Sequence, residues 1–185
     1  SASRGEMAWA IFTGSGEDTD FIGSDKDVPG SSHRDEEPLL YLYGGARVTL
    51  SDCFLIDHKG QAGHGEDSFL TMTRCLVQRF ITAGQYNGGT MNLVDCALVE
   101  FPAWDAPFAY VDNDAFYLTG GSPHSIKDTL FGWCLDDGID SGSGSSGDVI
   151  VEGCWYESAY HEAMAWSETG TRTVRDTVAI NSGQG

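Results

Sequence analysis

A short motif recurs six times between residues 50 and 180, and this repeat constrains the fold more than any other feature of the chain. Each copy has an apolar residue, a mostly polar residue, then Asp, Arg or Gly, then Cys or Thr, and then apolar residues. The Cys/Thr positions are Cys53, Cys75, Cys96, Thr129, Cys154 and Thr177, at steps of 22, 21, 33, 25 and 23 residues. Self-similarity at a period of about 20 to 50 residues indicates a repeat architecture.

Each unit contains short runs of alternating apolar residues, broken by Gly, Asn or Asp. The units are too short for a strand–helix–strand crossover, but they can stack as parallel strands ~4.8 Å apart. The chain also contains 24 glycines, which suits a fold rich in turns. The sequence therefore predicts an all-β, right-handed parallel β-helix of roughly six turns or more.

The Cys/Thr positions are expected to form a ladder that faces the interior of this solenoid. Small buried core residues explain the four ladder cysteines, with disulfide or metal roles as the alternatives. The chain has five cysteines and no CxxC pair of the kind that binds zinc. Cys134 lies off the ladder and is expected to be a free thiol.

The first part of the chain fits the repeat less well. We divide the sequence into residues 1–44, a partial turn followed by an acidic loop rich in Gly and Ser, and residues 45–185, the β-helix repeats. The segment from Glu6 to Trp9 resembles the segment from Glu162 to Trp166, so the chain is expected to open partway through a turn of a longer protein. Acidic residues between Asp18 and Asp27 suit either a solvated loop or a hard-cation site.

The formal net charge is −18, from 28 Asp and Glu against 10 Lys and Arg. Such a surface repels nucleic acid and anionic membranes, although adaptation to solubility or high salt also explains it. No apolar run reaches the ~20 residues of a membrane span, so membrane insertion is not expected.

Alignment on the ladder places residues of three successive turns in columns. An inward apolar column would contain Phe116, Ile139 and Met164. An outward acidic column would contain Asp114, Asp137 and Glu162. The column beside it would contain Asn113, Asp136 and His161, with Asp112 and Asp140 close by.

Equivalent side chains of neighbouring turns lie on the order of 5 Å apart. Carboxylates at that spacing repel, so either one pKa rises or a cation binds between them. A protonated carboxyl beside an ionised one can perform acid–base chemistry, and a bound calcium ion can neutralise an acidic sugar. The structural alternative is turn formation, because Asp, Asn and Asp-Gly are common at corners.

These residues give the chain a resemblance to the pectin-lyase-like β-helix superfamily, over roughly residues 45–185. Its polygalacturonase-type hydrolases carry Asn-Thr-Asp, Asp-Asp and Gly-His-Gly on successive turns, followed by Arg-Ile-Lys. This chain has Asn113-Asp114, Asp136-Asp137 and Tyr160-His161-Glu162, without the Thr, the two glycines or the Arg-Ile-Lys. The resemblance implies that Asp114, Asp136 and Asp137 supply acid and base for inverting hydrolysis, with His161 in support. Inversion requires carboxyl groups roughly 6.5–9.5 Å apart.

The pectate lyases of the same superfamily offer a second comparison. The segment from Asp136 to Asp140 resembles their calcium-binding cluster, which implies a calcium site. The expected metal ligands are Asp112, Asp137, Asp140 and Glu162. Lys127 and Arg172 are candidates for the base that a lyase needs. Epimerases show a partial likeness at Ser122-Pro123-His124, and Gly63-His64-Gly65 precedes the acidic turns and is predicted to be a loop.

The 33-residue step of the repeat contains an insertion at residues 102–110. Insertions in a solenoid often line its binding face. Its aromatic residues are expected either to stack on sugar rings or to pack the loop against the solenoid. The expected substrate-binding residues are Trp104, Tyr110, Tyr117 and Arg172.

The sequence thus predicts a secreted or cell-surface protein that acts on polysaccharide, as a hydrolase or as a calcium-dependent lyase. The alternative is a non-catalytic structural or adhesive module, because β-helix turns of this kind recur in large bacterial surface proteins. Open solenoid ends would favour end-to-end self-association in that case.

Overall fold

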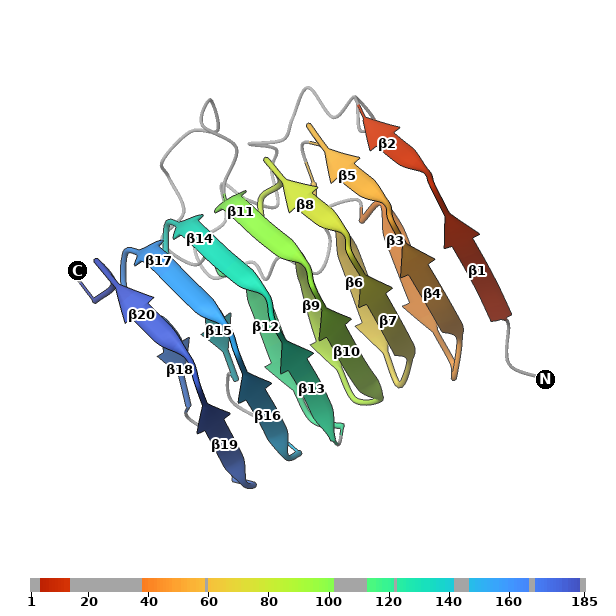
Figure 1. The fold of residues 1–185 in the computed structure, drawn as a ribbon. Coiled ribbons are helices and arrows are strands. Elements are labelled where there is room, and N and C mark those ends of the chain that lie inside the picture. The colour runs from red at the N-terminus through yellow and green to blue at the C-terminus, as the bar shows by residue number, and fades with distance from the viewer. Residues whose placement is uncertain are drawn as a thin grey trace, which may run out of the picture.

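The computed structural model of the chain describes residues 4–13, 38–58, 60–101, 113–121, 123–141, 147–166 and 169–183. These residues contain strands and turns only, arranged as three parallel sheets that wind into a solenoid (Figure 1). Within the described ranges, no helix is long and apolar enough to span a membrane. The predicted all-β, right-handed parallel β-helix is confirmed.

Each turn of the solenoid takes one strand from each sheet in the order A, B, C. Sheet A contains β1 (Arg4–Ala8), β4 (Arg47–Ser51), β7 (Phe69–Thr73), β10 (Thr90–Val94), β13 (His124–Lys127), β16 (Val149–Glu152) and β19 (Arg172–Arg175). Sheet B contains β2 (Ile11–Thr13), β5 (Phe54–Ile56), β8 (Leu76–Gln78), β11 (Ala97–Phe101), β14 (Leu130–Cys134), β17 (Trp155–Ala159) and β20 (Val178–Ile180). Sheet C contains β3 (Leu40–Tyr43), β6 (Gly63–Glu66), β9 (Gly84–Asn87), β12 (Phe116–Thr119), β15 (Ile139–Asp140) and β18 (Met164–Ala165).

The Cys/Thr ladder stands between sheets A and B, and its cysteines are buried free thiols, as is Cys134. Every ladder side chain donates to the carbonyl oxygen two residues earlier. Cys53 Sγ donates to Ser51 O at 3.3 Å, and Thr129 Oγ1 donates to Lys127 O at 2.8 Å. A thiol and a hydroxyl can both make this bond from a small buried side chain, which explains why either Cys or Thr can occupy the ladder position.

The residue before each ladder position turns the chain sharply from sheet A into sheet B. Asp52, Asp95, Asp128 and Asp176 adopt the left-handed conformation there, with φ of 56°, 54°, 48° and 48°. Aspartate is among the few residues other than glycine that tolerate this region. The Asp of the sequence motif is therefore a corner residue.

An inter-turn stack of aromatic side chains runs through the core. The ring centroids of Tyr86 and Phe116 lie 5.8 Å apart, those of Phe116 and Phe131 6.5 Å apart, and those of Phe131 and Tyr156 4.8 Å apart. All four side chains are buried. The stack links the sheets along the axis of the solenoid.

The prediction of a loop at Gly63-His64-Gly65 was wrong, because these residues form strand β6. The ring of Tyr86 from the next turn fills the space beside both glycines. A Cβ at Gly65 would lie 2.5 Å from Cδ1 of Tyr86, which is closer than atoms can approach. Both glycines leave room for this core ring.

The N-terminal strands already belong to the solenoid. Met7 of β1 pairs with Leu50 of β4 in sheet A, whereas Met164 lies in sheet C. The segments Glu6–Trp9 and Glu162–Trp166 therefore resemble each other in sequence but lie in different sheets of the solenoid. The expected acidic loop between Asp18 and Asp27, with its alternative cation site, lies outside the described residues.

Candidate acidic site

The candidate site lies at the corner where the chain leaves sheet B and enters sheet C. Asp136 and Asp137 follow β14, and His161 and Glu162 follow β17. The predicted alignment of these turns is confirmed, because Phe116 pairs with Ile139 and Ile139 pairs with Met164. The repeat thus brings residues 25 positions apart into contact.

The column of Asp114, Asp137 and Glu162 does not face outward along its length. Asp114 is 1% exposed and Asp137 5% exposed. Asp114 Oδ1 accepts the backbone N–H of Asp137 at 3.1 Å, and Asp137 Oδ1 accepts that of Glu162 at 2.7 Å. Each buried carboxylate therefore holds the following turn in register, a role that positions the site.

This polar column continues into earlier turns, which the sequence analysis did not anticipate. Gln61 and Thr82 pair in an isolated bridge and are both buried, and Thr82 Oγ1 lies 3.3 Å from Ala115 O of the next turn. The spacing of the repeat could have revealed Thr82. It lies seven residues after Cys75, just as Asp136 lies seven residues after Thr129, and Asp136 directly precedes the column member Asp137.

His161 joins the acidic groups at the surface. Its Nδ1 lies 3.3 Å from Asp136 Oδ1 and 3.5 Å from Asp137 Oδ1, and it also contacts the carboxylate of Glu162. The side chains of His161 and Glu162 are half exposed, whereas that of Asp136 is largely covered. Three carboxyl groups from two turns therefore surround one imidazole nitrogen.

The environment of Asp137 raises the pKa of its carboxyl to about 7. Burial is the largest cause, and the neighbouring carboxyls of Glu162 and Asp136 act in the same direction, while the bond from the Glu162 N–H opposes them. A hydrogen bond between the Asp137 and Glu162 side chains also favours the protonated form. The Asp137 carboxyl consequently keeps its proton up to near neutral pH.

A metal ion would find its donors in Asp136, Asp137 and His161, whose ligand atoms all lie within 4.8 Å of one another. Calcium prefers oxygen ligands, and an imidazole nitrogen suits a transition ion better. Of the calcium ligands expected from sequence, Asp112 lies outside the described residues. Asp140 lies on β15, where it pairs with Tyr117, and is thus displaced from the corner.

The remaining predicted residues are dispersed. Trp104 and Tyr110 lie outside the described residues. Tyr117 lies on β12 beside Asp140. Arg172 opens β19 in sheet A, where it donates to Gly147 O at 2.8 Å and lies over the Trp166 ring at 5.2 Å. Lys127 also lies in sheet A and pairs with Glu152 at 3.2 Å, so neither candidate lyase base lies at this corner.

Two exposed aromatic residues accompany the acids. Tyr160 directly precedes His161 and is 55% exposed, and Trp133 lies three residues before Asp136 and is 49% exposed. Neither was among the substrate-binding residues expected from sequence. Their position next to the acidic turns was visible in the sequence, but their exposure was not.

His124 of the partial epimerase likeness has a structural place. It is 1% exposed, its Nδ1 accepts the Met91 N–H at 3.1 Å, and its Nε2 lies 2.8 Å from Gly120 O. Burial lowers the pKa of this imidazole and that of His58. Nδ1 of His124 thus joins β13 to the neighbouring strand β10, and Nε2 contacts the turn that leads into β13.

No family model matches the chain, and comparisons with curated proteins and with solved structures find no match either. The parallel β-solenoid is compatible with a β-helix superfamily, so the fold supports that level of the resemblance.

Proposed function

We propose that this protein is an extracellular carbohydrate-active β-helix protein that hydrolyses glycosidic bonds at the corner formed by Asp136, Asp137, His161 and Glu162. The observation that carries the proposal is the close approach of the Asp136, Asp137 and Glu162 carboxyls around His161 Nδ1, at a place where burial raises the pKa of Asp137 to about 7. Glycoside hydrolysis needs one carboxyl protonated as the acid and one ionised as base or nucleophile.

The roles follow from exposure. Asp137 is buried and hydrogen bonded to Glu162, whose side chain is 48% exposed. Asp137 therefore stores the proton, and Glu162 passes it to the leaving-group oxygen. Asp136 is the second carboxyl of the pair, and His161 Nδ1 lies 3.3 Å from its Oδ1. Asp114, which is buried beneath them, positions Asp137.

The short separation favours retention over the inversion that the resemblance implied. Carboxyl oxygens of Asp136 and Glu162, the nucleophile and the acid of this proposal, both contact the same atom, His161 Nδ1, and therefore stand close together. Inverting enzymes need roughly 6.5–9.5 Å to admit a water molecule, whereas retaining enzymes hold their carboxyls about 5–5.5 Å apart. In the proposal Asp136 thus attacks the anomeric carbon as a nucleophile. Tyr160 and Trp133 would offer apolar faces to neighbouring sugars.

The test is an assay of a polysaccharide panel for reducing ends and for unsaturated products, with calcium and with a chelator. Asp136→Asn is the informative variant because it removes the carboxyl proposed as the nucleophile, while the backbone carbonyl of residue 136 still accepts the His161 N–H of the next turn at 3.2 Å. Asp140→Asn, one strand further along, is the matched control. Release of reducing ends that Asp136→Asn abolishes and Asp140→Asn retains supports the proposal.

Other results of this assay point elsewhere. Unsaturated products that require calcium would replace hydrolysis by lyase chemistry. An absence of product from every polymer, or equal activity of the Asp136→Asn variant, would contradict the proposal. Proton NMR of the first product then decides between retention and inversion.

A structural module is the second candidate, and one observation favours it specifically. The same carboxylates bond the backbone of the next turn, as Asp114 does for Asp137 and as Asp137 does for Glu162. The acids would then be there to hold the turns together in a stalk or adhesive protein. That candidate predicts no product from the panel and a loss of stability in the acid variants.

A further inference from the structure

The outer face of sheet B carries an apolar row that runs along the solenoid. The first outward residue of each strand pairs with its equivalent in the next turn, so the side chains stand side by side. The apolar row consists of Ile11, Phe54, Leu76, Ala97, Leu130, Trp155 and Val178. Phe54 is 46% exposed, Trp155 43% and Val178 40%. Large exposed apolar rows of this kind are typical of interaction surfaces.

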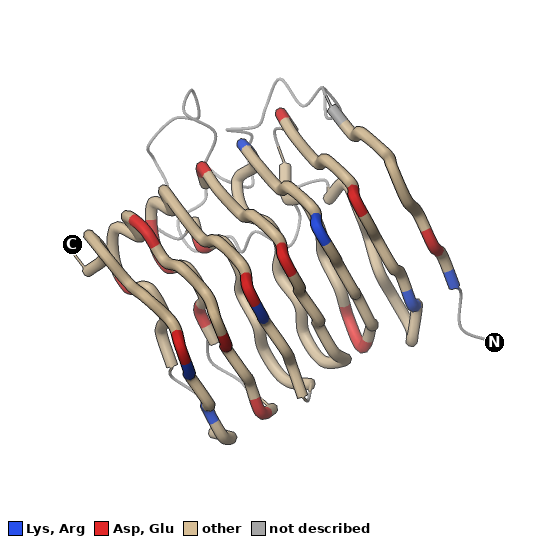
Figure 2. The backbone as a smooth tube through the Cα atoms, viewed as in Figure 1, with Lys and Arg blue, Asp and Glu red and all other residues tan. Residues whose placement is uncertain are grey.

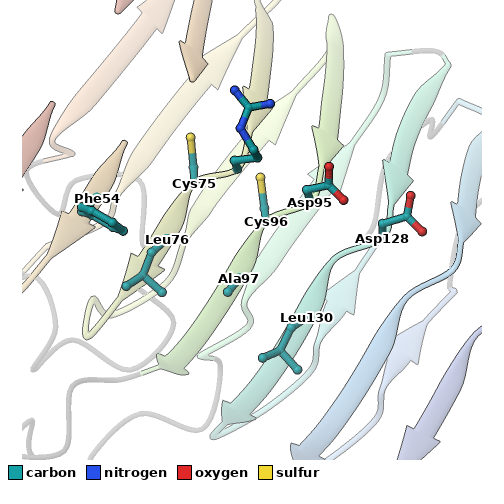
Figure 3. A pocket seen from close by; sticks show the side chains of 9 residues that line it. Phe54, Cys75, Leu76, Asp95, Cys96, Ala97, Asp128 and Leu130 are labelled. Atoms are coloured by element: carbon teal, nitrogen blue, oxygen red, sulfur yellow. The ribbon is translucent and has the colours of Figure 1, made fainter. Parts of the chain in front are cut away.

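A shallow depression of about 420 Å³ interrupts the row at Ala97, whose small side chain stands between Leu76 and Leu130 (Figure 3). Cys75 and Cys96 also line it. The backbone groups here are used between strands of the sheet, so the surface offers side chains and no free strand edge. A ligand would therefore be recognised through apolar contact and charge.

Acidic residues flank the apolar row on both sides. At the corner between sheets A and B stand four aspartates and one arginine, namely Asp52, Arg74, Asp95, Asp128 and Asp176. Arg74 is already paired with Asp52 at 2.6 Å. The other side has Asp57, Glu100 and Glu157, with Arg79 paired to the first two. The nearby cations Lys127 and Arg175 both engage Glu152, and Figure 2 shows acids recurring along successive turns.

We propose that the apolar row docks a basic amphipathic helix of a partner protein, with the apolar face of the helix against the row. The lysines and arginines that border such a face would then meet the flanking carboxylates on either side. Seven strands at ~4.8 Å spacing extend over about 29 Å, the length of a helix of about 19 residues. The exposed face of Trp155, beside the carboxylate of Glu157, also suits a cationic side chain.

Charge argues against the other occupants. A second copy of this chain would set acidic borders against acidic borders, and the formal charge of each copy is −18. An acidic polysaccharide would meet the same repulsion. The row is also separate from the acidic site, so this inference does not depend on the proposed hydrolysis.

The test measures binding of a fluorescent 18-residue Leu/Lys peptide whose leucines lie on one helical face. A peptide of the same composition with scrambled order and a Leu/Glu peptide of the same pattern are the controls. Leu130→Thr/Trp155→Thr removes apolar contact, and Asp95→Asn/Asp128→Asn removes border charge. Glu6→Gln/Glu66→Gln removes two charges from the other sheets as the matched control.

The expected result is binding of the segregated Leu/Lys peptide at least 10-fold tighter than binding of the scrambled one, with no binding of the Leu/Glu peptide. Both sheet B variants weaken binding at least 10-fold, the control pair changes it less than 2-fold, and added salt weakens it. Three results would overturn the proposal. They are equal binding of both Leu/Lys peptides, no binding of either peptide, and unchanged binding by sheet B variants that are still folded. A dimer in sedimentation that Leu130→Thr dissociates, or binding of a neutral oligosaccharide that Trp155→Thr abolishes, would also overturn it.

Discussion

The Asp137 carboxylate accepts the backbone N–H of Glu162 at 2.7 Å, although it lies 25 residues earlier in the chain. The bond crosses from one turn of the solenoid to the next at the corner between sheets B and C. It couples the protonation of a buried carboxyl to the register of the turns. A substitution at Asp137 therefore changes both the titration of this corner and the stability of the fold.

The free energy of unfolding should decrease as the pH rises from about 4 to about 7, because Asp137 titrates differently in the folded and unfolded states. Its folded-state pKa is raised to about 7 from 3.8, so in this range the folded state keeps a proton that the unfolded state has released. Asp137→Asn keeps an acceptor for the Glu162 N–H and removes the titration. We compare the free energy of unfolding of Asp137→Asn with that of wild type at each pH. This difference should favour the variant at pH 8 by on the order of a few kcal/mol more than it does at pH 4.

Urea unfolding at the two pH values measures this difference. The buried imidazoles of His124 and His58 have lowered pKa values and act in the opposite direction, with stability lost below about pH 6.5. Comparison of variant with wild type at each pH cancels their contribution. A difference that is the same at both pH values would contradict the raised pKa of Asp137.

Removal of the Asp114 carboxylate should destabilise the solenoid without exposing any new surface charge. Asp114→Ala leaves the N–H of Asp137 without its side-chain acceptor, which costs about 1–3 kcal/mol. Asp114→Asn retains an oxygen at that place and should cost less. Urea unfolding measures the stability of the two variants. If Asp114→Asn were the less stable one, the charge of Asp114, and not its acceptance of the Asp137 N–H, would be the stabilising factor.

The ladder between sheets A and B should depend on its hydrogen bond more than on its shape. Thr129→Val is nearly isosteric, but it loses the donor to Lys127 O and the acceptor for Cys96 N–H, and should cost about 1–2 kcal/mol. Thr129→Cys installs the side chain that the ladder uses elsewhere and should cost less. Equal midpoints for the two variants in thermal unfolding would refute the role assigned to the ladder bond.

The pair of Gly65 and Tyr86 should behave as one unit. Gly65→Ala puts a Cβ 2.5 Å from both the Tyr86 ring and Ser68 Oγ, of which the hydroxyl can rotate away, and should destabilise the fold by about 1–3 kcal/mol. Tyr86→Leu leaves a space that the new methyl group can partly fill. A double-mutant cycle should therefore show a favourable coupling between Gly65→Ala and Tyr86→Leu, whereas strict additivity would mean that the ring is not the obstacle.

The sequence predicted the fold because the ladder spacing fixes which residues stack. The alignment of Phe116, Ile139 and Met164 follows from that spacing alone. The burial of Asp114 did not follow, because residues at a corner leave the alternation of inward and outward side chains that a strand imposes.

The strand at Gly63 to Glu66 was also hidden from sequence reasoning. Its glycines are explained by Tyr86, which stands 21 residues after Gly65 and fills the space they leave in the neighbouring turn. Such complementarity of size between turns has no local signature. The gathering of His161 with Asp136 and Asp137, in contrast, was expected from the spacing of the repeat, and the contacts agree with it.

The corner of Asp136, Asp137, His161 and Glu162 is expected to hold a proton near neutral pH, on the Asp137 carboxyl. Carbon-detected NMR titration of the side-chain carboxyl groups measures this, with Asp137→Asn to assign the signal and Asp140→Asn as the control. We expect one carboxyl that titrates near pH 7, is absent in Asp137→Asn and is retained in Asp140→Asn. Titration of every carboxyl below about pH 5, near the ordinary values for Asp and Glu, would contradict it.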